Sequence, residues 1–268
     1  MKGKVVIITG ASSGIGKACA EVFGLKGSKI VITGRNEEKL NEATSELQSK
    51  GVEVVAVVSD VAQEADNQKV VAAALQHFGR IDVLINNAGI SMRALFKDLD
   101  VSVIKQVMDI NFYGAVYATK AALPEIIRNK GSIVGVSSIA GYRGLPARTG
   151  YSSSKFALQG FLESIRTELL HSGVHVLTAC PGFTASNIRN TALSKDGSAQ
   201  SESPLNEGEI MTAEEVAEAI YNATVHRKRD LVLTSQGKLT VFLNKWFPGF
   251  MDKMVYKHFA KEKDSPLG

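Results

Sequence analysis

The sequence has few cysteines and no long hydrophobic run. Its 268 residues include 2 cysteines, Cys19 and Cys180, and neither has neighbours at the spacing of a metal site or a disulfide framework. We therefore expect reduced structural thiols, a reducing compartment and no bound metal. No apolar stretch approaches the roughly 18 residues of a membrane span, and the first residues show no secretion signal. These absences indicate a cytoplasmic protein.

An excess of one charge sign is also missing. The chain has 31 basic and 27 acidic residues, which gives a net charge of +4. Apart from residues 226–229 and the C-terminal tail, the basic residues are scattered, so composition does not indicate a nucleic-acid partner. With 44% hydrophobic residues, the chain is long enough to bury the core of one large domain.

Short β-branched runs alternate with longer helical patterns along the chain. This alternation predicts an α/β fold, a doubly wound parallel sheet of about seven strands with helices on both faces. The expected strands are residues 5–8, 29–33, 53–58, 83–85, 132–136, 175–179 and 231–233. The expected helices are residues 15–26, 37–50, 63–78, 102–128, 151–171 and 213–225. Thr212 and Glu215 predict a capping box at the start of the last of these helices.

A glycine-rich turn follows the first predicted strand. Residues 9–16 read Thr-Gly-Ala-Ser-Ser-Gly-Ile-Gly, with the spacing Gly-xxx-Gly-x-Gly. One glycine lets the chain leave the strand, one lets an anion approach the backbone, and one lets the following helix pack closely on the sheet. Free amides at the start of that helix favour a pyrophosphate. A loop that only turns the chain could show the same glycines, but the surrounding βαβ pattern favours a dinucleotide site.

Further motifs follow the later strands. They are Asn-Asn-Ala-Gly at 86–89, Asn-Phe-Tyr-Gly at 111–114, Ser-Ser-Ile-Ala-Gly at 137–141, Tyr-Ser-Ser-Ser-Lys at 151–155 and Pro-Gly at 181–182. With the glycine turn, this set resembles the short-chain dehydrogenase/reductase family, and the resemblance extends over residues 3–235. It implies a Rossmann-type fold and hydride transfer between a nicotinamide cofactor and a carbonyl or secondary alcohol.

Tyr151 and Lys155 are the central pair of the expected catalytic set. At positions i and i+4 they share one face of a helix, so the Lys155 ammonium is expected to lower a tyrosine pKa that is otherwise ~10. Tyr151 could then act as acid or base near neutral pH. An isolated pair with this spacing would more often be a surface pair. The resemblance implies that Ser138 holds the substrate oxygen against Tyr151. It also implies that Asn111 interrupts its helix and anchors a water that relays protons through Lys155, which grips the nicotinamide ribose.

The resemblance also implies the cofactor contacts. The expected contacts are Gly10, Ser12, Ser13, Gly14, Ile15 and Gly16 at the phosphates and ribose, Asp60 and Val61 at the adenine, Asn87, Ala88 and Gly89 along the adenosine, and Pro181, Gly182 and Thr184 near the nicotinamide. Ser186 stands where the family often has threonine, and its contact is less secure.

Arg35 predicts that the cofactor is NADP(H). Enzymes that select NAD usually carry an acidic residue at the end of the second strand, which binds the ribose hydroxyls. Here Gly34 is followed by Arg35, whose guanidinium can bind a 2'-phosphate through two hydrogen bonds. The alternative is a solvated charge at a helix start, and Glu37 or Glu38 could weaken the preference.

The polar segment 186–211 is expected to be a loop that either closes over the substrate or is disordered, and the first alternative is favoured. The substrate is expected to be an apolar small molecule with a carbonyl or alcohol group. A 3-oxoacyl reductase and a hydroxysteroid-type dehydrogenase would look alike at these positions. A nucleotide-binding protein without catalytic activity is the alternative from another functional class, and the intact catalytic set argues against it.

The resemblance also implies that the helices starting at 102 and 151 pair with their copies in a homodimer or homotetramer.

Residues 238–268 extend beyond the dehydrogenase domain, which is expected to span residues 1–237. Phe242, Trp246, Phe250 and Met254 recur every fourth residue, and Pro248-Gly249 is expected to divide the segment into two short helices with one apolar side. We expect this side to pack over the substrate pocket or against a neighbouring subunit. Docking to a membrane surface is an alternative and plain core packing another. The membrane alternative depends on the basic side formed by Lys238, Lys245, Lys253, Lys257 and Lys261.

Overall fold

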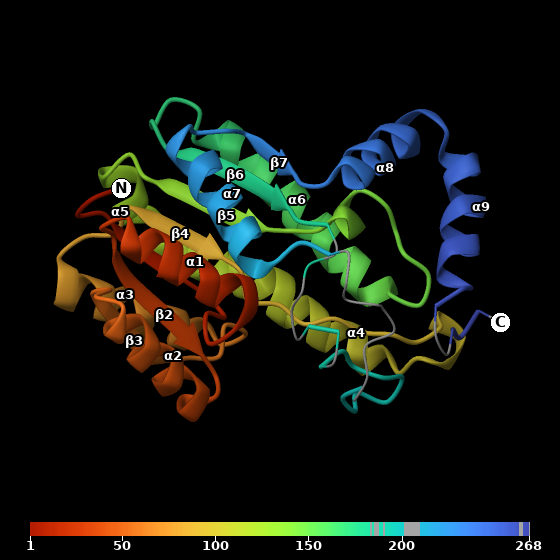
Figure 1. Ribbon diagram of the computed structural model, residues 1–268, viewed down its shortest axis with the longest axis horizontal. Helices are drawn as coiled ribbons and strands as arrows, with labels where there is room; N and C mark the ends of the chain where they lie inside the picture. The colour runs from red at the N-terminus through yellow and green to blue at the C-terminus, as the bar shows by residue number, and fades with distance from the viewer. Residues whose placement is uncertain (183, 185–187, 190, 201–209, 263–264, 268) are drawn as a thin grey trace.

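The computed structural model describes residues 1–182, 184, 188–189, 191–200, 210–262 and 265–267. Seven strands form one parallel sheet in the order β3-β2-β1-β4-β5-β6-β7 (Figure 1). The strands are β1 (Val5–Ile8), β2 (Lys29–Gly34), β3 (Val54–Val58), β4 (Val83–Asn86), β5 (Ser132–Val136), β6 (His175–Cys180) and β7 (Asp230–Val232). The predicted doubly wound sheet is thus confirmed, with strand ends shifted by a residue or two.

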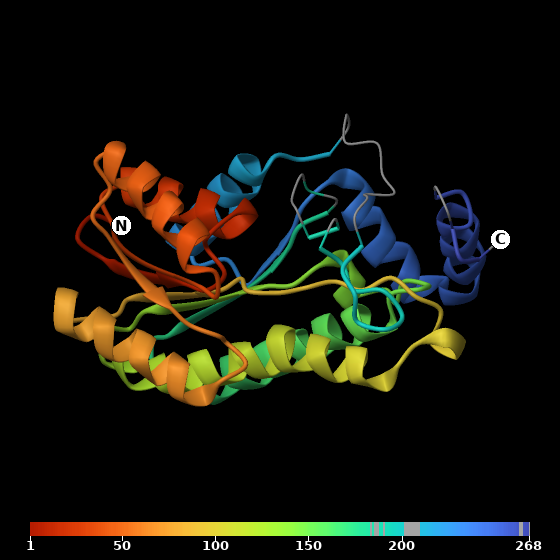
Figure 2. The same cartoon turned by 90° about the horizontal axis from the view of Figure 1, so that it is seen from below.

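Helices cover both faces of the sheet (Figure 2). One face carries α1 (Gly14–Leu25), α2 (Glu37–Ser49) and α7 (Ala213–Val225), and the other carries α3 (Glu64–Phe78), α5 (Gly114–Arg128) and α6 (Thr149–Glu168). The capping box predicted for α7 is present, because Thr212 Oγ1 accepts from the Glu215 amide and the Glu215 carboxylate accepts from the Thr212 amide.

The helix expected over 102–128 is interrupted at Asn111, as the family resemblance implies. The segment is divided into α4 (Val101–Met108), a π-helical turn (Asp109–Tyr113) and α5. The turn contains Asn111, whose side chain exchanges hydrogen bonds with the backbone of Ile90, from the amide Nδ2 to the carbonyl at 2.9 Å and from the Ile90 amide to Oδ1 at 2.8 Å. A π-helical turn accommodates an extra residue in the helix, and here it turns the Asn111 side chain toward the segment after β4.

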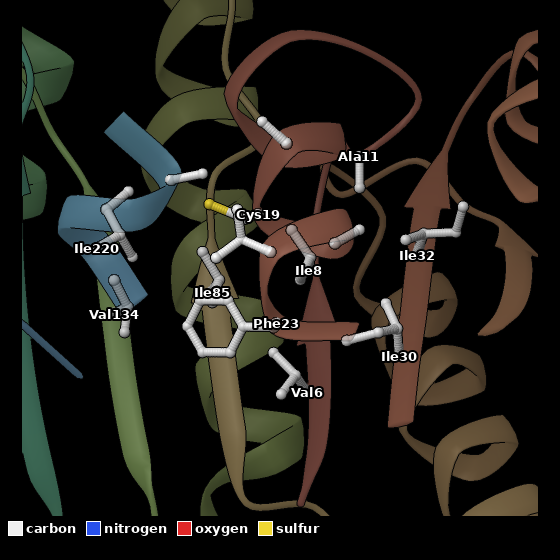
Figure 3. Packing of buried hydrophobic residues seen from close by; sticks show 14 of the residues in the cluster. Val6, Ile8, Ala11, Cys19, Phe23, Ile30, Ile32, Ile85, Val134 and Ile220 are labelled. Atoms are coloured by element: carbon white, nitrogen blue, oxygen red, sulfur yellow. The ribbon is translucent and has the colours of Figure 1, made fainter. Parts of the chain in front are cut away.

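Alternation along the strands divides the core into two layers. In β1, Val6 and Ile8 pack with the layer that contains Phe23 of α1, whereas Ile7 packs on the opposite layer. Figure 3 shows the first layer, with Phe23 and Cys19 packed over β1 and β4.

Both cysteines are buried and form no disulfide, and burial raises the pKa of each thiol to about 12. Such thiols are protonated at neutral pH and unreactive, as expected of structural cysteines.

Asp82 joins the N-terminus to the start of β4. Its side chain is 3% exposed and accepts hydrogen bonds from Lys4 Nζ at 2.9 Å, the Val5 amide at 3.0 Å and two nitrogens of Arg80 at 2.8 and 2.6 Å. Burial alone would raise the pKa of this carboxyl, but the hydrogen bonds from Arg80, Lys4 and Val5 outweigh it and hold the pKa below its usual value.

We expect Asp82→Ala to lower the free energy of unfolding by about 2–3 kcal/mol at pH 7, because it leaves a buried amide and two cations without their acceptor. Since the folded state lowers the carboxyl pKa, the stabilisation is complete above the unfolded-state pKa of ~4 and is lost as pH falls through the folded-state value. Urea unfolding of wild type and variant at pH 7 and pH 3 measures this. Asp98→Ala, at an exposed position, is the control. A difference that does not shrink at pH 3 would contradict the assignment.

The last two helices are α8 (Ser235–Trp246) and α9 (Pro248–Phe259), which confirms the predicted division at Pro248. The stripe expected on their apolar side does not pack over the substrate pocket, and its packing against a neighbouring subunit stays a prediction. The buried residues of α9 are Met251, Val255 and Phe259, which lie against Leu145 and Leu243. The stripe that recurs every fourth residue, Phe242, Trp246, Phe250 and Met254, does not pack on the domain and is exposed. No helix among the described residues is long and apolar enough to span a bilayer.

Candidate functional site

A cleft of about 690 Å³ lies beyond the carboxyl ends of the central strands. Because the strand order reverses between β1 and β4, this is the position at which open α/β sheets bind ligands. The volume is within the usual range for small-molecule sites. The predicted cofactor residues that line it are Gly10, Ser12, Ser13, Gly14, Ile15, Arg35, Asp60, Val61, Asn87, Ala88 and Gly89.

The glycine turn forms one wall of the cleft. Gly10 has φ +64°, and a Cβ at this position would lie 2.8 Å from Ala88 Cα. A Cβ on Gly16 would lie 2.5 Å from both the Gly10 carbonyl oxygen and Asn87 Nδ2, whose amide donates to the Thr9 and Gly10 carbonyls at 2.9 and 3.0 Å. Gly16 does not line the cleft, and its role is to let α1 approach the turn. The glycines let a ligand approach the backbone of the turn closely, and the amides at the start of α1 can bind an anion. Both features fit the phosphates of a dinucleotide.

Two basic residues lie where β2 ends. Arg35 lines the cleft as predicted, and Lys39, on the first turn of α2, lines it as well. The sequence analysis did not identify Lys39, although it lies in the first turn of the predicted helix that follows Arg35. Glu37 and Glu38, which could have weakened a phosphate site, are not among the residues that line the cleft.

Tyr151, Lys155 and Ser138 lie together past the end of β5. Ser138 begins a short 3-10 turn and accepts from the Ala140 amide at 3.1 Å, and its side chain is the hydrogen-bonding neighbour of the Tyr151 hydroxyl. Lys155 is 4% exposed; its ammonium lies 5.7 Å from the centre of the Tyr151 ring and donates to the Val136 carbonyl at 2.9 Å. The residues expected to be catalytic are therefore brought together.

The structure corrects the expected pKa of Tyr151. Burial raises the pKa of this hydroxyl above 10, and the hydrogen bond with Ser138 opposes the rise only in part. Burial also lowers the pKa of Lys155 to about 8. The same removal from water that disfavours a phenolate thus disfavours the ammonium expected to stabilise it. In this structure Tyr151 is a protonated hydroxyl at neutral pH.

Asn111 and Gly89 complete this end of the site. Besides its bonds to Ile90, Asn111 Nδ2 donates to Ser154 Oγ at 2.9 Å. A Cβ on Gly89 would lie 3.2 Å from Asn111 Oδ1 and 3.5 Å from Lys155 Nζ. Glycine at this position therefore keeps the space between Asn111 and Lys155 open.

The turn after β6 is described only in part. Pro181, Gly182 and Thr184 follow β6, and the buried Thr184 hydroxyl donates to the Gly182 carbonyl at 3.1 Å. None of these, nor Ser138, Tyr151 or Lys155, lines the cleft itself. The prediction for Ser186 and much of the segment 186–211 lie outside the described residues. Of that segment, Ile188, Thr191 and Leu193 line the cleft and were not identified from the sequence.

The segment between Ser138 and Tyr151 is tied to the last two helices. Arg148 donates to both oxygens of Glu262 at 2.9 Å, and its guanidinium lies 4.6 Å from the centre of the Phe259 ring. Arg143 donates to Asn244 at 3.1 Å and pairs with Asp252. The Glu262 carboxylate is only 3% exposed and also lies 3.5 Å from Arg93. We call residues 142–148 the tethered segment.

Comparison with known proteins finds short-chain dehydrogenases by family model and by sequence identity. Residues 4–197 match the family described as short chain dehydrogenase. The chain is 36% identical over 271 residues to mouse dehydrogenase/reductase SDR family member 7B, covering 99% of this chain and 84% of that protein. It is 38% identical over 262 residues to the uncharacterized oxidoreductase YxnA of Bacillus subtilis, covering 96% of this chain and 72% of that protein.

Solved structures of short-chain dehydrogenases and alcohol dehydrogenases share the fold of this chain. A short chain dehydrogenase/reductase from Burkholderia phymatum in complex with NAD superposes with a TM-score of 0.83 at 25% identity, covering 93% of this chain and 95% of that one. An alcohol dehydrogenase from Thermococcus sibiricus complexed with 5-hydroxy-NADP superposes with a TM-score of 0.75 at 25% identity, covering 86% of this chain and 95% of that one.

Proposed function

Since the chain belongs to the short-chain dehydrogenase/reductase family, we propose that it is an NADP(H)-dependent oxidoreductase acting on a carbonyl or secondary alcohol. The observation that carries the proposal is the grouping of Ser138, Tyr151 and Lys155 beside a cleft built on a glycine turn. A bound nicotinamide supplies or accepts the hydride. The glycine turn, Asp60 and residues 87–89 would hold the adenosine half of the cofactor, and Lys155 its nicotinamide ribose.

Ser138 and Tyr151 would act on the substrate oxygen. Ser138 orients a carbonyl oxygen by a hydrogen bond, and Tyr151 donates its proton to that oxygen. Because burial raises the Tyr151 pKa, the hydroxyl is protonated at neutral pH and is ready to act as the acid. A protonated hydroxyl is the form that a general acid needs when a carbonyl is reduced.

Arg35 and Lys39 support NADP(H) rather than NAD(H). Both line the cleft at the end of β2, and they provide two positive charges where an enzyme that selects NAD has a carboxylate. The solved relatives include complexes with NAD and with an NADP analogue, so the choice for this chain depends on these two side chains.

Oxidation of NADPH and NADH against ketones, aldehydes and 3-oxoacyl thioesters tests the proposal. A 3-oxoacyl reductase would turn over the thioesters, and a hydroxysteroid-type enzyme would prefer bulky cyclic ketones. Binding of NADPH without turnover of any carbonyl would favour the non-catalytic nucleotide-binding alternative.

Lys155 gives an expected pH dependence. Burial lowers its pKa to about 8, so the ammonium is charged below that pH and neutral above it. We expect the affinity of the free enzyme for NADPH to fall as pH rises through about 8, because a neutral amine attracts the ribose less. Titration of NADPH fluorescence between pH 7 and 10 measures it, and Lys155→Met should remove the pH dependence. An affinity that is constant to pH 10 in the wild type would contradict this role.

We also propose that the protein is a homodimer or homotetramer. Val101, Tyr113 and Phe156 are large hydrophobic residues on or between α4, α5 and α6 that are exposed in the single chain. Apolar surface of this kind is typical of subunit contacts. Sedimentation equilibrium at micromolar concentration tests the assembly, and a purely monomeric protein would overturn it.

A further inference from the structure

The last two helices present large apolar side chains to solvent. The exposed fractions lie between 45% and 62%, a range usual for charged side chains rather than for aromatic ones. We call this set the α8–α9 apolar face: Leu239, Phe242, Trp246, Phe247, Phe250 and Met254.

These residues form a face because of their helical spacing. Leu239, Phe242 and Trp246 lie at i, i+3 and i+7 in α8, and Phe250 and Met254 lie at i and i+4 in α9, so each group shares one side of its helix. A different side of α9, with Met251, Val255 and Phe259, packs on the domain. The two helices meet in a corner at the end of the molecule farthest from the N-terminus (Figure 1).

Exposed lysines accompany the face on both helices. They lie at residues 238, 245, 253, 257 and 261. On the helical projection Lys238 and Lys245 lie on one side of Phe242, and Lys253 and Lys257 on one side of Phe250, each within about 60°. The acidic residues between 238 and 262 are Asp252 and Glu262, and both are paired with arginines of the tethered segment. The lysine charges are therefore not compensated by a carboxylate of their own segment.

We propose that the α8–α9 apolar face docks on an anionic lipid surface. The aromatic residues would enter the interfacial region while the lysine ammonium groups reach the lipid phosphates, an arrangement typical of interfacial helices. Charge complementarity favours lipid over a second copy of the chain. In a two-fold contact the same patch meets itself, so the lysines of one copy would face those of the other.

Tryptophan fluorescence can report whether this face contacts lipid. It contains 1 tryptophan, Trp246, which lies within the face, so the indole fluorescence reports on the face alone. Addition of vesicles of phosphatidylglycerol and phosphatidylcholine should shift the emission to shorter wavelength, and brominated lipid should quench it. Vesicles of phosphatidylcholine alone, or high salt, should lower the partition coefficient at least about tenfold because the lysine contribution is lost.

A double variant keeps Trp246 as the fluorescent reporter and removes two aromatic side chains of the face. Phe242→Ser/Phe250→Ser should lower binding to the anionic vesicles at least about tenfold, with a melting temperature close to that of the wild type because neither side chain is buried. Leu170→Ser, at a position 69% exposed just after α6, is the control and should bind like the wild type.

Several results would overturn the proposal: no emission shift with anionic vesicles, equal binding to both vesicle types, or unchanged binding by the double variant. An emission shift of Trp246 that appears without lipid and grows with protein concentration, together with dimer formation in sedimentation, would also overturn the proposal. It would assign the α8–α9 apolar face to contact with a second copy of the chain. None of these readouts depends on enzyme activity.

Discussion

Tyr151→Phe is expected to lower kcat at least about 10²-fold, because general acid catalysis by a positioned side chain contributes at least that factor. The substitution removes one oxygen atom and leaves the ring in place. Since the hydroxyl belongs to the reacting end of the site and does not line the main cleft, the dissociation constant for NADPH should change by less than about twofold. Single-turnover measurements together with fluorescence titration of NADPH separate these two effects.

Tyr221→Phe is the matched control for this experiment. Tyr221 lies on α7, partly buried, with its ring 5.0 Å from that of Phe23, so the same loss of a hydroxyl occurs beside the core on the other face of the sheet. The control should keep full activity. If Tyr151→Phe retained more than about a tenth of the wild-type kcat, a loss of only ~1.4 kcal/mol, the proton-donor role would be wrong.

Arg35→Asp is expected to reverse the cofactor preference. In the wild type kcat/KM should be higher with NADPH than with NADH, because the positive charges of Arg35 and Lys39, which line the cleft, would attract a 2'-phosphate. The variant replaces a charge-assisted hydrogen bond by repulsion of the phosphate, and the ratio of kcat/KM for NADPH over NADH should fall about 10²-fold or more. Most of this change should arise in KM, since the 2'-phosphate is remote from the reacting atoms.

Lys39→Asp should act in the same direction, and its effect with Arg35→Asp should not be additive if both side chains contact one phosphate. Arg128→Asp, on an exposed arginine at the end of α5, controls for the change in net charge. Equal use of NADPH and NADH by the wild type would refute the assignment.

Sequence periodicity and motif spacing predict most of what positions the site. The strands could be located because each is a short apolar run between helical patterns, and the glycine turn could be interpreted because a strand precedes it and a helix follows. The interruption of the helix at Asn111 followed from the family resemblance and not from the periodicity, since residues 109–113 continue a helical pattern and the turn is held by the contact between Asn111 and Ile90.

The electrostatics of the site were the least predictable part. The spacing of Tyr151 and Lys155 is correctly interpreted as one face of a helix, but the pKa depends on burial, which opposes the charged form of both groups. Similarly, the stripe of Phe242, Trp246, Phe250 and Met254 was expected to pack over the substrate pocket or against a neighbouring subunit, and in the chain it is exposed. Recurrence every fourth residue identifies one side of a helix but does not say whether that side faces the protein.

The tethered segment also has a consequence for local unfolding. Its arginines are anchored to α8, α9 and Glu262, while its two ends continue into Ser138 and Tyr151. Opening of the C-terminal helices would therefore leave Arg148 without its buried partner, and the segment before Tyr151 would open with them as one cooperative unit. In a thermal ramp followed by hydrogen exchange, amides of α9 and of residues 142–150 should lose protection together, and activity should decline in that step while the central strands remain protected.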